Sequence, residues 1–452
     1  MNKTMRHIAV DLLVRIDSSN SYSNEILDSA IKKNSLSNND QRLLTRIFYG
    51  VLENKILIDC HIGNLSKIRI GKLHEKILNS LRIAIYQIIF LDNIPISAAV
   101  NESVKIANKT NRHSAGFVNG VLRNFVRKYE KGLLPLPGEE NEVRNISVKY
   151  SLPEWIVEEL LKQFDFESLK NIAASNNQAP PLSLRVNTIK TTKKDLEQNL
   201  SSIGIETAES IHADDGLTIK TSKDTSVNEN QYFSKGHYYI QDEASMMVSQ
   251  YLSPNPGEIV FDLCAAPGGK TTHVAQIMQQ SGRIRAFDLY SQRVKSIVDN
   301  SNRLGIRIID AETKDSAYTD CKLAESADRV LVDVPCSGIG IFRRKPELKY
   351  RISKNDIGEI IKTQRKLIDN AAVYVRKNGF IVYSTCTLNY NENDKIVFDF
   401  LQRNKNFRLV DINKGRYPAI FKESVPFIKE AIHTYSHRDG TDGFFICMIQ
   451  KK

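Results

Sequence analysis

Two cysteines in the C-terminal half of the chain follow short apolar runs and have polar neighbours. Cys336 lies in the string DVPCSGIG after the run RVLVD, and Cys386 lies in STCTLNYNEN after FIVYS. A lone cysteine at a strand end is usually an inert packing residue, and this is the interpretation we give Cys60, Cys321 and Cys447. Two such cysteines, one beside an Asp-x-Pro turn and one beside hydroxyl groups, are hard to explain as packing. They are therefore candidates for chemistry.

A third motif is rich in small residues. The run IVFDL leads into a loop that ends in two glycines and a lysine, formed by Cys264, Ala265, Ala266, Pro267, Gly268, Gly269 and Lys270. Small residues let a backbone approach a ligand closely, here just before the expected start of a helix. The loop matches neither the P-loop pattern nor GxGxxG.

Carboxylates follow the next two apolar runs of this region. Asp288 ends the run IRAFD, where a carboxylate can hold both ribose hydroxyls of an adenosine ligand. Asp315 follows the run at residues 306–309 and is placed to receive an adenine amino group, although capping a helix is an equal alternative. Together with the glycine-rich loop, the two carboxylates favour a nucleoside cofactor.

The elements that position these motifs alternate in type. Short apolar runs, most of them followed by a loop and a helical pattern, occupy residues 259–263, 284–288, 306–309, 329–333 and 380–384. Buried parallel strands that alternate with helices predict a doubly wound, Rossmann-like α/β sheet. Ligand sites of such sheets lie at the carboxyl ends of the strands, where all the motifs above would meet.

The preceding residues predict two further domains. Apolar residues recur at helical spacing from Met5 to about Lys128, which indicates an all-α bundle over residues 1–133. A Pro- and Gly-rich linker at 134–140 precedes a small α+β, RRM-like module at 145–236. This module has two helices between residues 153 and 174 and strands near 182–186, 217–219 and 238–240. The α/β domain then covers residues 237–452.

Composition sets the remaining expectations. Lys plus Arg number 63 against 52 Asp plus Glu, a net charge of +11, which favours a polyanion such as nucleic acid but equally fits a generically basic protein. No apolar run reaches the ~20 residues of a membrane span and no signal peptide is visible, so we expect a cytoplasmic protein without a membrane partner. The cysteines form no CxxC pair, so neither a metal nor a disulfide framework is expected. We also expect a monomer.

Four strings resemble one known family. CAAPGGKTTH, DVPCSGIGIFRRKPE, STCTLNYNEN and HRDGTDGFF are similar to motifs of the RNA 5-methylcytosine methyltransferases of the Nol/Nop/Sun family. The N-terminal strings ISAAVNESVKIAN and GFVNGVLRNF resemble the NusB-like domain of one bacterial branch, which acts on 16S ribosomal RNA. The resemblance covers essentially the whole chain. Val334 and Thr387 replace the more common Ala and Ser, and both changes are conservative.

The resemblance implies a reaction and a set of roles. Cys386 would add to C6 of a cytosine, which makes C5 nucleophilic enough to take a methyl group from S-adenosylmethionine. Asp333 would hold N3 and the exocyclic amine, and Cys336 would assist loss of the C5 proton and β-elimination. Lys270 would orient or polarise the base, with a surface lysine at a helix start as the equal alternative. The cofactor would bind the loop of residues 264–270, Asp288, Asp315 and Asp333.

The same resemblance bears on the RNA. The residues Arg343, Arg344 and Lys345, which follow the PC motif, would lie at the catalytic edge near RNA phosphates. The target base must be flipped or single-stranded, because the chemistry needs its edge and face free. The helical domain and the small module would supply RNA affinity rather than chemistry.

Three other functions compete with this one. A DNA cytosine-5 methyltransferase would attack with the cysteine of its PC motif and would not need a Thr-Cys pair on the next strand. A non-catalytic RNA-binding assembly factor would be expected to lack Cys386 or the CAAPGGK loop, and both are present. Transfer RNA is the closest alternative substrate, since only the NusB-like domain favours ribosomal RNA, and by analogy.

Overall fold

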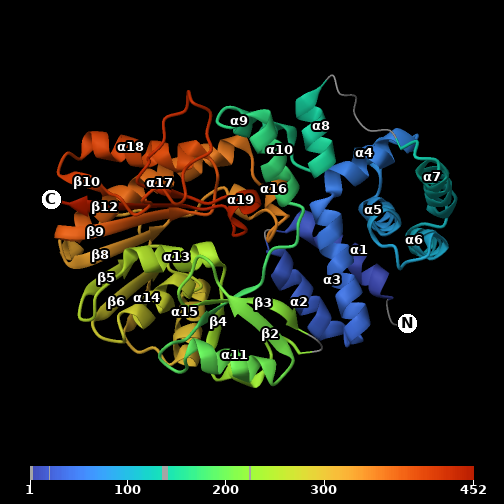
Figure 1. Ribbon diagram of the computed structural model, residues 1–452. Helices are drawn as coiled ribbons and strands as arrows, with labels where there is room; N and C mark the ends of the chain where they lie inside the picture. Colours follow the sequence, from blue (N-terminus) through green and yellow to red (C-terminus); the bar gives the residue numbers. More distant parts are fainter. Residues whose placement is uncertain (1–3, 20, 135–140, 223–224) are drawn as a thin grey trace. The chain divides into compact units, whose positions relative to one another are not determined.

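The structure is a computed structural model of the chain that describes residues 4–19, 21–134, 141–222 and 225–452 (Figure 1). Contacts divide it into two compact units. The first comprises Met1–Lys162, Phe166–Gln178 and the short segment Phe342–Arg351. The second comprises Gln163–Asp165, Ala179–Ile341 and Ile352–Lys452.

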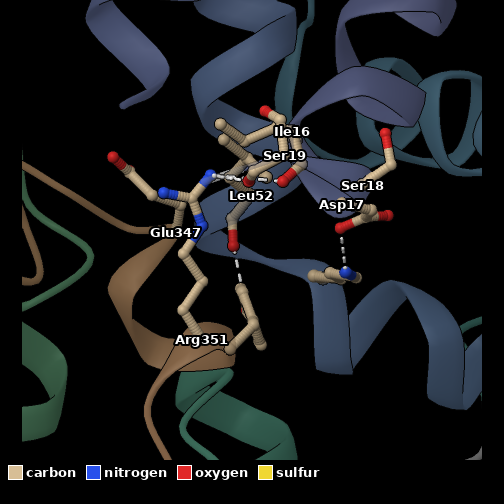
Figure 2. A pocket seen from close by; sticks show the side chains of 9 residues that line it. Ile16, Asp17, Ser18, Ser19, Leu52, Glu347 and Arg351 are labelled. Carbon is tan, nitrogen blue, oxygen red and sulfur yellow. Dashed lines mark hydrogen bonds and ion pairs between the residues drawn. The ribbon is translucent and has the colours of Figure 1, made fainter. Parts of the chain in front are cut away.

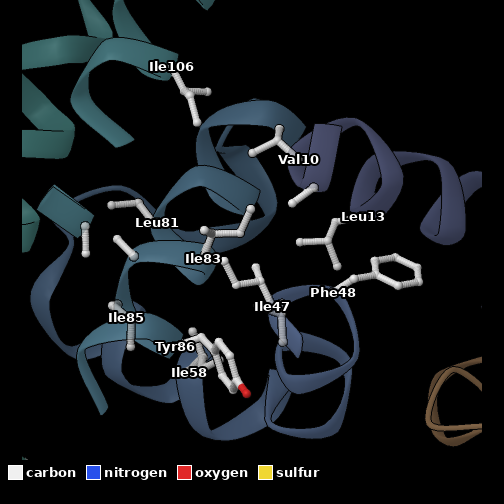
Figure 3. Packing of buried hydrophobic residues seen from close by; sticks show 14 of the residues in the cluster. Val10, Leu13, Ile47, Phe48, Ile58, Leu81, Ile83, Ile85, Tyr86 and Ile106 are labelled. Atoms are coloured by element: carbon white, nitrogen blue, oxygen red, sulfur yellow. The ribbon is translucent and has the colours of Figure 1, made fainter. Parts of the chain in front are cut away.

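The first unit is helical, as its apolar spacing predicts. Ser37 caps one helix by accepting a hydrogen bond from the Asp40 backbone N–H. The interior is closely packed with apolar side chains such as Leu13, Ile47 and Leu81 (Figure 3). The helices are α1 (Met5–Ser18), α2 (Ser23–Asn34), α3 (Asn38–Glu53), α4 (Lys55–Leu65), the 3₁₀ turn η1 (Ile70–Lys72), α5 (Glu75–Phe90), α6 (Ile96–Thr110), α7 (Ser114–Tyr129), α8 (Glu142–Tyr150), α9 (Glu154–Leu161), α10 (Phe166–Ser175) and α16 (Leu348–Arg351).

The contacts of α8, α9 and α10 differ from the predicted grouping. Two of them, α9 and α10, were expected within a module at residues 145–236, and α8 is an addition, but the contacts of all three group them with the first unit. Most of the predicted linker, residues 135–140, lies outside the described residues. The domain boundaries given above stay a prediction.

A small antiparallel sheet opens the second unit. Its strands are β1 (Ser183–Val186), β2 (Ile205–Glu209), β3 (Gly216–Ser222) and β4 (Tyr238–Ile240), in the order β2-β3-β1-β4. The helices α11 (Lys193–Ser201) and α12 (Gln231–Ser234) accompany it. Leu184 and Val186 of β1 pack with Leu196 and Leu200 of α11. The three strands predicted from apolar patterns are confirmed, and β2 is an addition.

The large sheet carries the motifs. Its order is β10-β12-β9-β8-β5-β6-β7, with β11 paired to β12. The strands β5 to β9 are parallel, which confirms the doubly wound prediction, whereas β12 pairs antiparallel with both β9 and β10. The strands are β5 (Ile259–Asp262), β6 (Arg283–Asp288), β7 (Ile309–Thr313), β8 (Ala327–Asp333), β9 (Val375–Thr385), β10 (Phe407–Val410), β11 (Ile432–His433) and β12 (Phe445–Lys451).

Helices cover both faces of this sheet. Val260 of β5 packs in a cluster with α13 and α14, whereas its neighbour Phe261 packs with α17, because successive strand residues point to opposite faces. The helices are α13 (Glu243–Leu252), α14 (Gly269–Ile277), α15 (Ser291–Leu304), α17 (Lys354–Tyr374), α18 (Asp394–Arg403) and α19 (Ser436–Asp439), with 3₁₀ turns η2 (Cys321–Leu323), η3 (Ile339–Ile341) and η4 (Tyr390–Glu392).

One predicted strand is displaced. The run at residues 306–309 was expected to be a strand, but β7 begins only at Ile309. Gly305, with φ +77°, ends α15 in the left-handed conformation, so residues 306–308 form the connection to the sheet. Within the described ranges, no helix is long and apolar enough to span a membrane.

Candidate active site

The glycine-rich loop links β5 to α14 at the carboxyl edge of the large sheet. The Ala265 backbone N–H donates to the Phe287 carbonyl at 2.9 Å, which holds the loop against the next strand. Gly268 has φ +98°, and a Cβ there would lie 3.2 Å from Ile297 Cα. Both facts favour glycine at this turn. The loop thus presents backbone at the N-terminus of α14, as an anionic or polar ligand requires.

The two strand-end carboxylates make different contacts. Asp288, which is 4% exposed, accepts from the backbone N–H groups of Ala266 at 3.2 Å and Tyr290 at 3.3 Å. It therefore ties the loop to the end of β6. Asp315 accepts from the Ala317 backbone N–H at 2.9 Å, a local backbone contact of the kind that the capping alternative describes.

Lys270, Asp333 and Ser384 form a polar chain. The Lys270 Nζ donates to Asp333 Oδ2 at 2.7 Å, and the Ser384 hydroxyl donates to Asp333 Oδ1 at 2.7 Å. Burial acts to lower the pKa of Lys270, but Asp333 outweighs it and the pKa is raised above its usual value. The alternative of a surface lysine is wrong, because the side chain is 15% exposed and ion-paired.

The two candidate cysteines meet. Their Sγ atoms lie 3.2 Å apart, although the residues are separated by fifty positions. The hydrogen bond to Cys386, together with burial and the nearby Glu392 carboxylate, raises the pKa of Cys336 well above the usual range. Cys386 is also among the groups that raise the pKa of Lys270, so an ammonium group lies near this thiol.

A buried glutamate joins the loops that carry the thiols. Glu392 accepts from the Ser337 backbone N–H at 2.8 Å, from Asn389 Nδ2 at 3.0 Å and from Gln364 Nε2 at 3.1 Å. Burial raises the pKa of this carboxyl. The Ser337 and Thr387 hydroxyls lie 2.6 Å apart and add a direct contact between the loops. Sequence reasoning missed Glu392, although the string NYNEN contained it.

Sequence reasoning also missed a second buried carboxyl group, that of Asp262. Asp262 ends β5, is almost fully buried and accepts from the Thr271 hydroxyl at 2.7 Å. Burial raises its pKa to about 7. The signal that could have identified Asp262 is its position at the end of β5, immediately before the glycine-rich loop.

A cavity of about 270 Å³ opens beside this chain of groups. Its walls come from the glycine-rich loop, Asp262, Asp333 and β4 with the residues that follow it: Tyr239, Ile240, Gln241, Asp242 and Ser245. The small sheet therefore contributes one wall of the site, which the sequence did not indicate.

The basic residues after the PC motif belong to the first unit. Arg343 is buried, and Lys345 places its Nζ 4.2 Å from the centre of the Tyr22 ring. Both lie in the segment Phe342–Arg351, which belongs to the first unit. Arg351 of this segment donates to the backbone carbonyls of Ile16 and Ser19 (Figure 2) and to that of Ser21.

That Arg343, Arg344 and Lys345 lie at the catalytic edge stays a prediction. The Gly340 backbone N–H, just before this segment, donates to the Cys386 carbonyl at 3.1 Å. One prediction fails for Cys321, which is exposed rather than packed, whereas Cys447 is buried in the core as expected. In the part of the chain that the structure describes, no group of three or more His, Cys, Asp or Glu is arranged to hold a metal.

These features define a class of protein. A doubly wound parallel sheet, a glycine-rich loop at its carboxyl edge and a strand-end carboxylate at Asp288 are what an adenosine-containing cofactor requires. The residues fit S-adenosylmethionine, with backbone N–H groups at the start of α14 and an acceptor at the end of β6. The protein is an S-adenosylmethionine-dependent methyltransferase.

Comparisons with known proteins name the family. Residues 249–450 match the model described as 16S rRNA methyltransferase RsmB/F, residues 3–127 match the NusB family, and residues 152–226 match the ferredoxin-like domain of RsmF/B-like methyltransferases. A probable ribosomal RNA small subunit methyltransferase B from Bacillus subtilis is 37% identical over 100% of both chains. The chain belongs to the RsmB/F family of ribosomal RNA small subunit methyltransferases.

Other relatives agree with this. A ribosomal RNA small subunit methyltransferase B from Shigella flexneri is 30% identical over 92% of both chains. The crystal structure of PH0851 superposes with a TM-score of 0.82 at 29% identity, covering 100% of this chain and 99% of the other. The similarity therefore extends over the helical unit as well as the catalytic sheet.

Proposed function

We propose that this protein forms 5-methylcytosine in 16S ribosomal RNA through a covalent bond between Cys386 and C6 of the target base. The observation that carries the proposal is the meeting of two thiols, 3.2 Å apart, next to the Lys270–Asp333 ion pair. A reaction that only transferred a methyl group to nitrogen or oxygen would need no thiol. Addition to a pyrimidine needs one, and release of the adduct needs a second group.

The chemistry follows from the nucleophile. The Cys386 thiolate adds to C6, and the electron pair of the C5–C6 double bond becomes available at C5. S-adenosylmethionine, when bound, would supply an electrophilic methyl group to C5, and its sulfur would keep the electron pair of the broken S–CH3 bond. Loss of the C5 proton then restores the double bond as the C6–S bond breaks and the thiolate leaves. Lys270 places a positive charge near Cys386, which becomes negative when it leaves C6.

The other groups have assigned roles. Asp333 holds N3 and the exocyclic amine of the base, and Cys336 assists loss of the proton and elimination. The cofactor binds the loop of residues 264–270, Asp288, Asp315 and Asp333.

Substitutions of the two cysteines separate nucleophilic addition from release of the adduct. Cys386→Ala should give neither methylated product nor a covalent protein–RNA complex. Cys336→Ala should accumulate a covalent complex that survives denaturing electrophoresis. Cys447→Ala, a buried cysteine of the same sheet, is the matched control and should leave turnover per folded molecule unchanged. A complex that persists in Cys386→Ala and disappears in Cys336→Ala would reverse the roles.

The substrate is tested in cells. Bisulfite sequencing of ribosomal and transfer RNA, with and without the gene, should lose one signal in 16S ribosomal RNA. Loss of a signal in transfer RNA alone would assign the enzyme to that substrate instead. We propose in addition that it acts in the cytoplasm as a monomer.

The NusB-like unit is proposed to supply RNA affinity. The chain has a net charge of +11, and contacts to phosphates release counterions. Observed binding to 16S ribosomal RNA should therefore fall steeply as salt is raised. An affinity that did not depend on salt would remove this role.

A further inference from the structure

The cavity beside Lys270 and Asp333 contains one buried donor without a partner. Gln241, which directly follows β4, lines the cavity and is 8% exposed. Among the described residues, its Nε2 has no hydrogen-bond partner. Buried donors in native proteins are nearly always satisfied, so an exception at a cavity wall indicates a group that arrives with a ligand.

The orientation of this amide is determined by a buried cation. Arg185 of β1 is fully buried and donates from Nη1 to Gln241 Oε1 at 2.6 Å. Because a guanidinium can only donate, the atom facing it must be the oxygen, and Nε2 is the amide atom left for an occupant of the cavity.

Arg185 is itself firmly held. Its guanidinium also donates to the Gly269 carbonyl and, at 2.8 Å, to the Thr272 hydroxyl, and it lies over the Tyr239 ring at 5.2 Å. The guanidinium that orients the Gln241 amide therefore also contacts the start of α14. Gln241 and α14 belong to the same unit. This is a preorganised donor rather than a flexible side chain at a rim.

We propose that Gln241 is a substrate-contacting residue whose Nε2–H donates to an oxygen of a reactant in this cavity, either the 2-oxo group of the target cytosine or the carboxylate of S-adenosylmethionine. The inference rests on the proposed function and deepens it. Both oxygens accept hydrogen bonds. A carboxylate such as Asp333 cannot donate one to them, whereas the Gln241 amide can.

Two substitutions test the donor. Gln241→Glu keeps an acceptor for Arg185 but lacks the N–H, so it should fold and fail in function. Gln241→Ala removes both. Each should lose roughly 10- to 100-fold in one of two measurements, as loss of a hydrogen bond to a buried acceptor implies. The measurements are the affinity for S-adenosylmethionine by calorimetry, and the single-turnover methylation rate of 16S ribosomal RNA at saturating cofactor.

The pattern of losses identifies the acceptor. Weaker cofactor binding with an unchanged single-turnover rate at saturation assigns the carboxylate. Unchanged cofactor affinity with a slower single turnover assigns the cytosine. The inference is overturned if the wild-type enzyme methylates cytosine and both variants match it in the two measurements. Failure of the proposed function is a different result, since the wild-type enzyme itself would then make no 5-methylcytosine.

Asn187→Ala is the matched structural control. Asn187 is a buried amide next to β1 whose Nδ2 donates to the carbonyls of Gly236 and Leu304, and it does not line the cavity. Its loss should lower the melting temperature while leaving cofactor affinity and single-turnover rate within about twofold of wild type. Equal functional losses in Asn187→Ala and the Gln241 variants would mean that Gln241 acts through stability, which would also overturn the inference.

Discussion

The core of the helical unit and the carboxyl edge of the large sheet are both buried, but they bury different groups. In the bundle, Phe48 and Phe125 are fully buried in a cluster of apolar side chains. At the sheet edge, Asp262, Glu392 and Asn393 are equally buried and accept hydrogen bonds from a helix, a loop and a strand, respectively. Apolar packing stabilises a region without specifying chemistry, whereas satisfied polar groups fix where loops lie. Variants at the edge should therefore lose function first, and variants in the core should lose stability first.

The largest expected effect is at Asp333. Asp333→Asn keeps the shape of the side chain but loses the charge that pairs with Lys270 at 2.7 Å. We expect the rate of methyl transfer to fall by roughly 10²- to 10⁴-fold, the usual contribution of a positioned acid or base. Single-turnover methylation measures it. A variant with nearly full rate would remove Asp333 from the chemistry.

The core should behave in the opposite way. Phe48→Ala removes a fully buried ring from the bundle and should cost about 3–5 kcal/mol of the free energy of unfolding, through lost transfer energy and a cavity. Cofactor affinity of the folded protein should not change. Urea unfolding and calorimetry measure the two quantities, and a weakened cofactor affinity would contradict the separation drawn above.

A smaller effect is expected at Asp288. Asp288→Ala removes the acceptor for the Ala266 N–H and the proposed acceptor for the cofactor ribose. The loss of a charge-assisted contact predicts a cost of about 1.5–3 kcal/mol in cofactor binding. Calorimetric titration with S-adenosylmethionine tests it, and an unchanged affinity would exclude Asp288 from the site.

The smallest effect is a dependence of stability on pH. Burial raises the pKa of Asp262 to about 7 in the folded state, above its value in the unfolded chain. The stability linked to its bound proton is present at low pH and is lost as pH rises through about 7. Asp262→Asn cannot ionise, so its free energy of unfolding should fall less between pH 5 and pH 8 than that of the wild type. The slope is bounded by about 1.4 kcal/mol per pH unit. Parallel curves for the two proteins would show that Asp262 does not titrate in this range.

Patterns within short stretches of sequence predicted much of this molecule. Apolar runs located β1, β3, β4 and the parallel strands other than β7, and helical spacing located the bundle, because these signals depend on neighbours in the chain. The strings around Cys336 and Cys386 placed both thiols at one sheet edge, since carboxyl ends of parallel strands meet there.

Only the tertiary structure decided the contacts between distant residues. Arg185 meets Gln241 across 56 positions, Ser337 meets Glu392 across 55, and the segment Phe342–Arg351 joins helices from the start of the chain. No local pattern encodes such pairs, because each depends on which faces the folded elements bring together. The residue types with chemistry were readable from the sequence, whereas their partners, burial and charge came from packing.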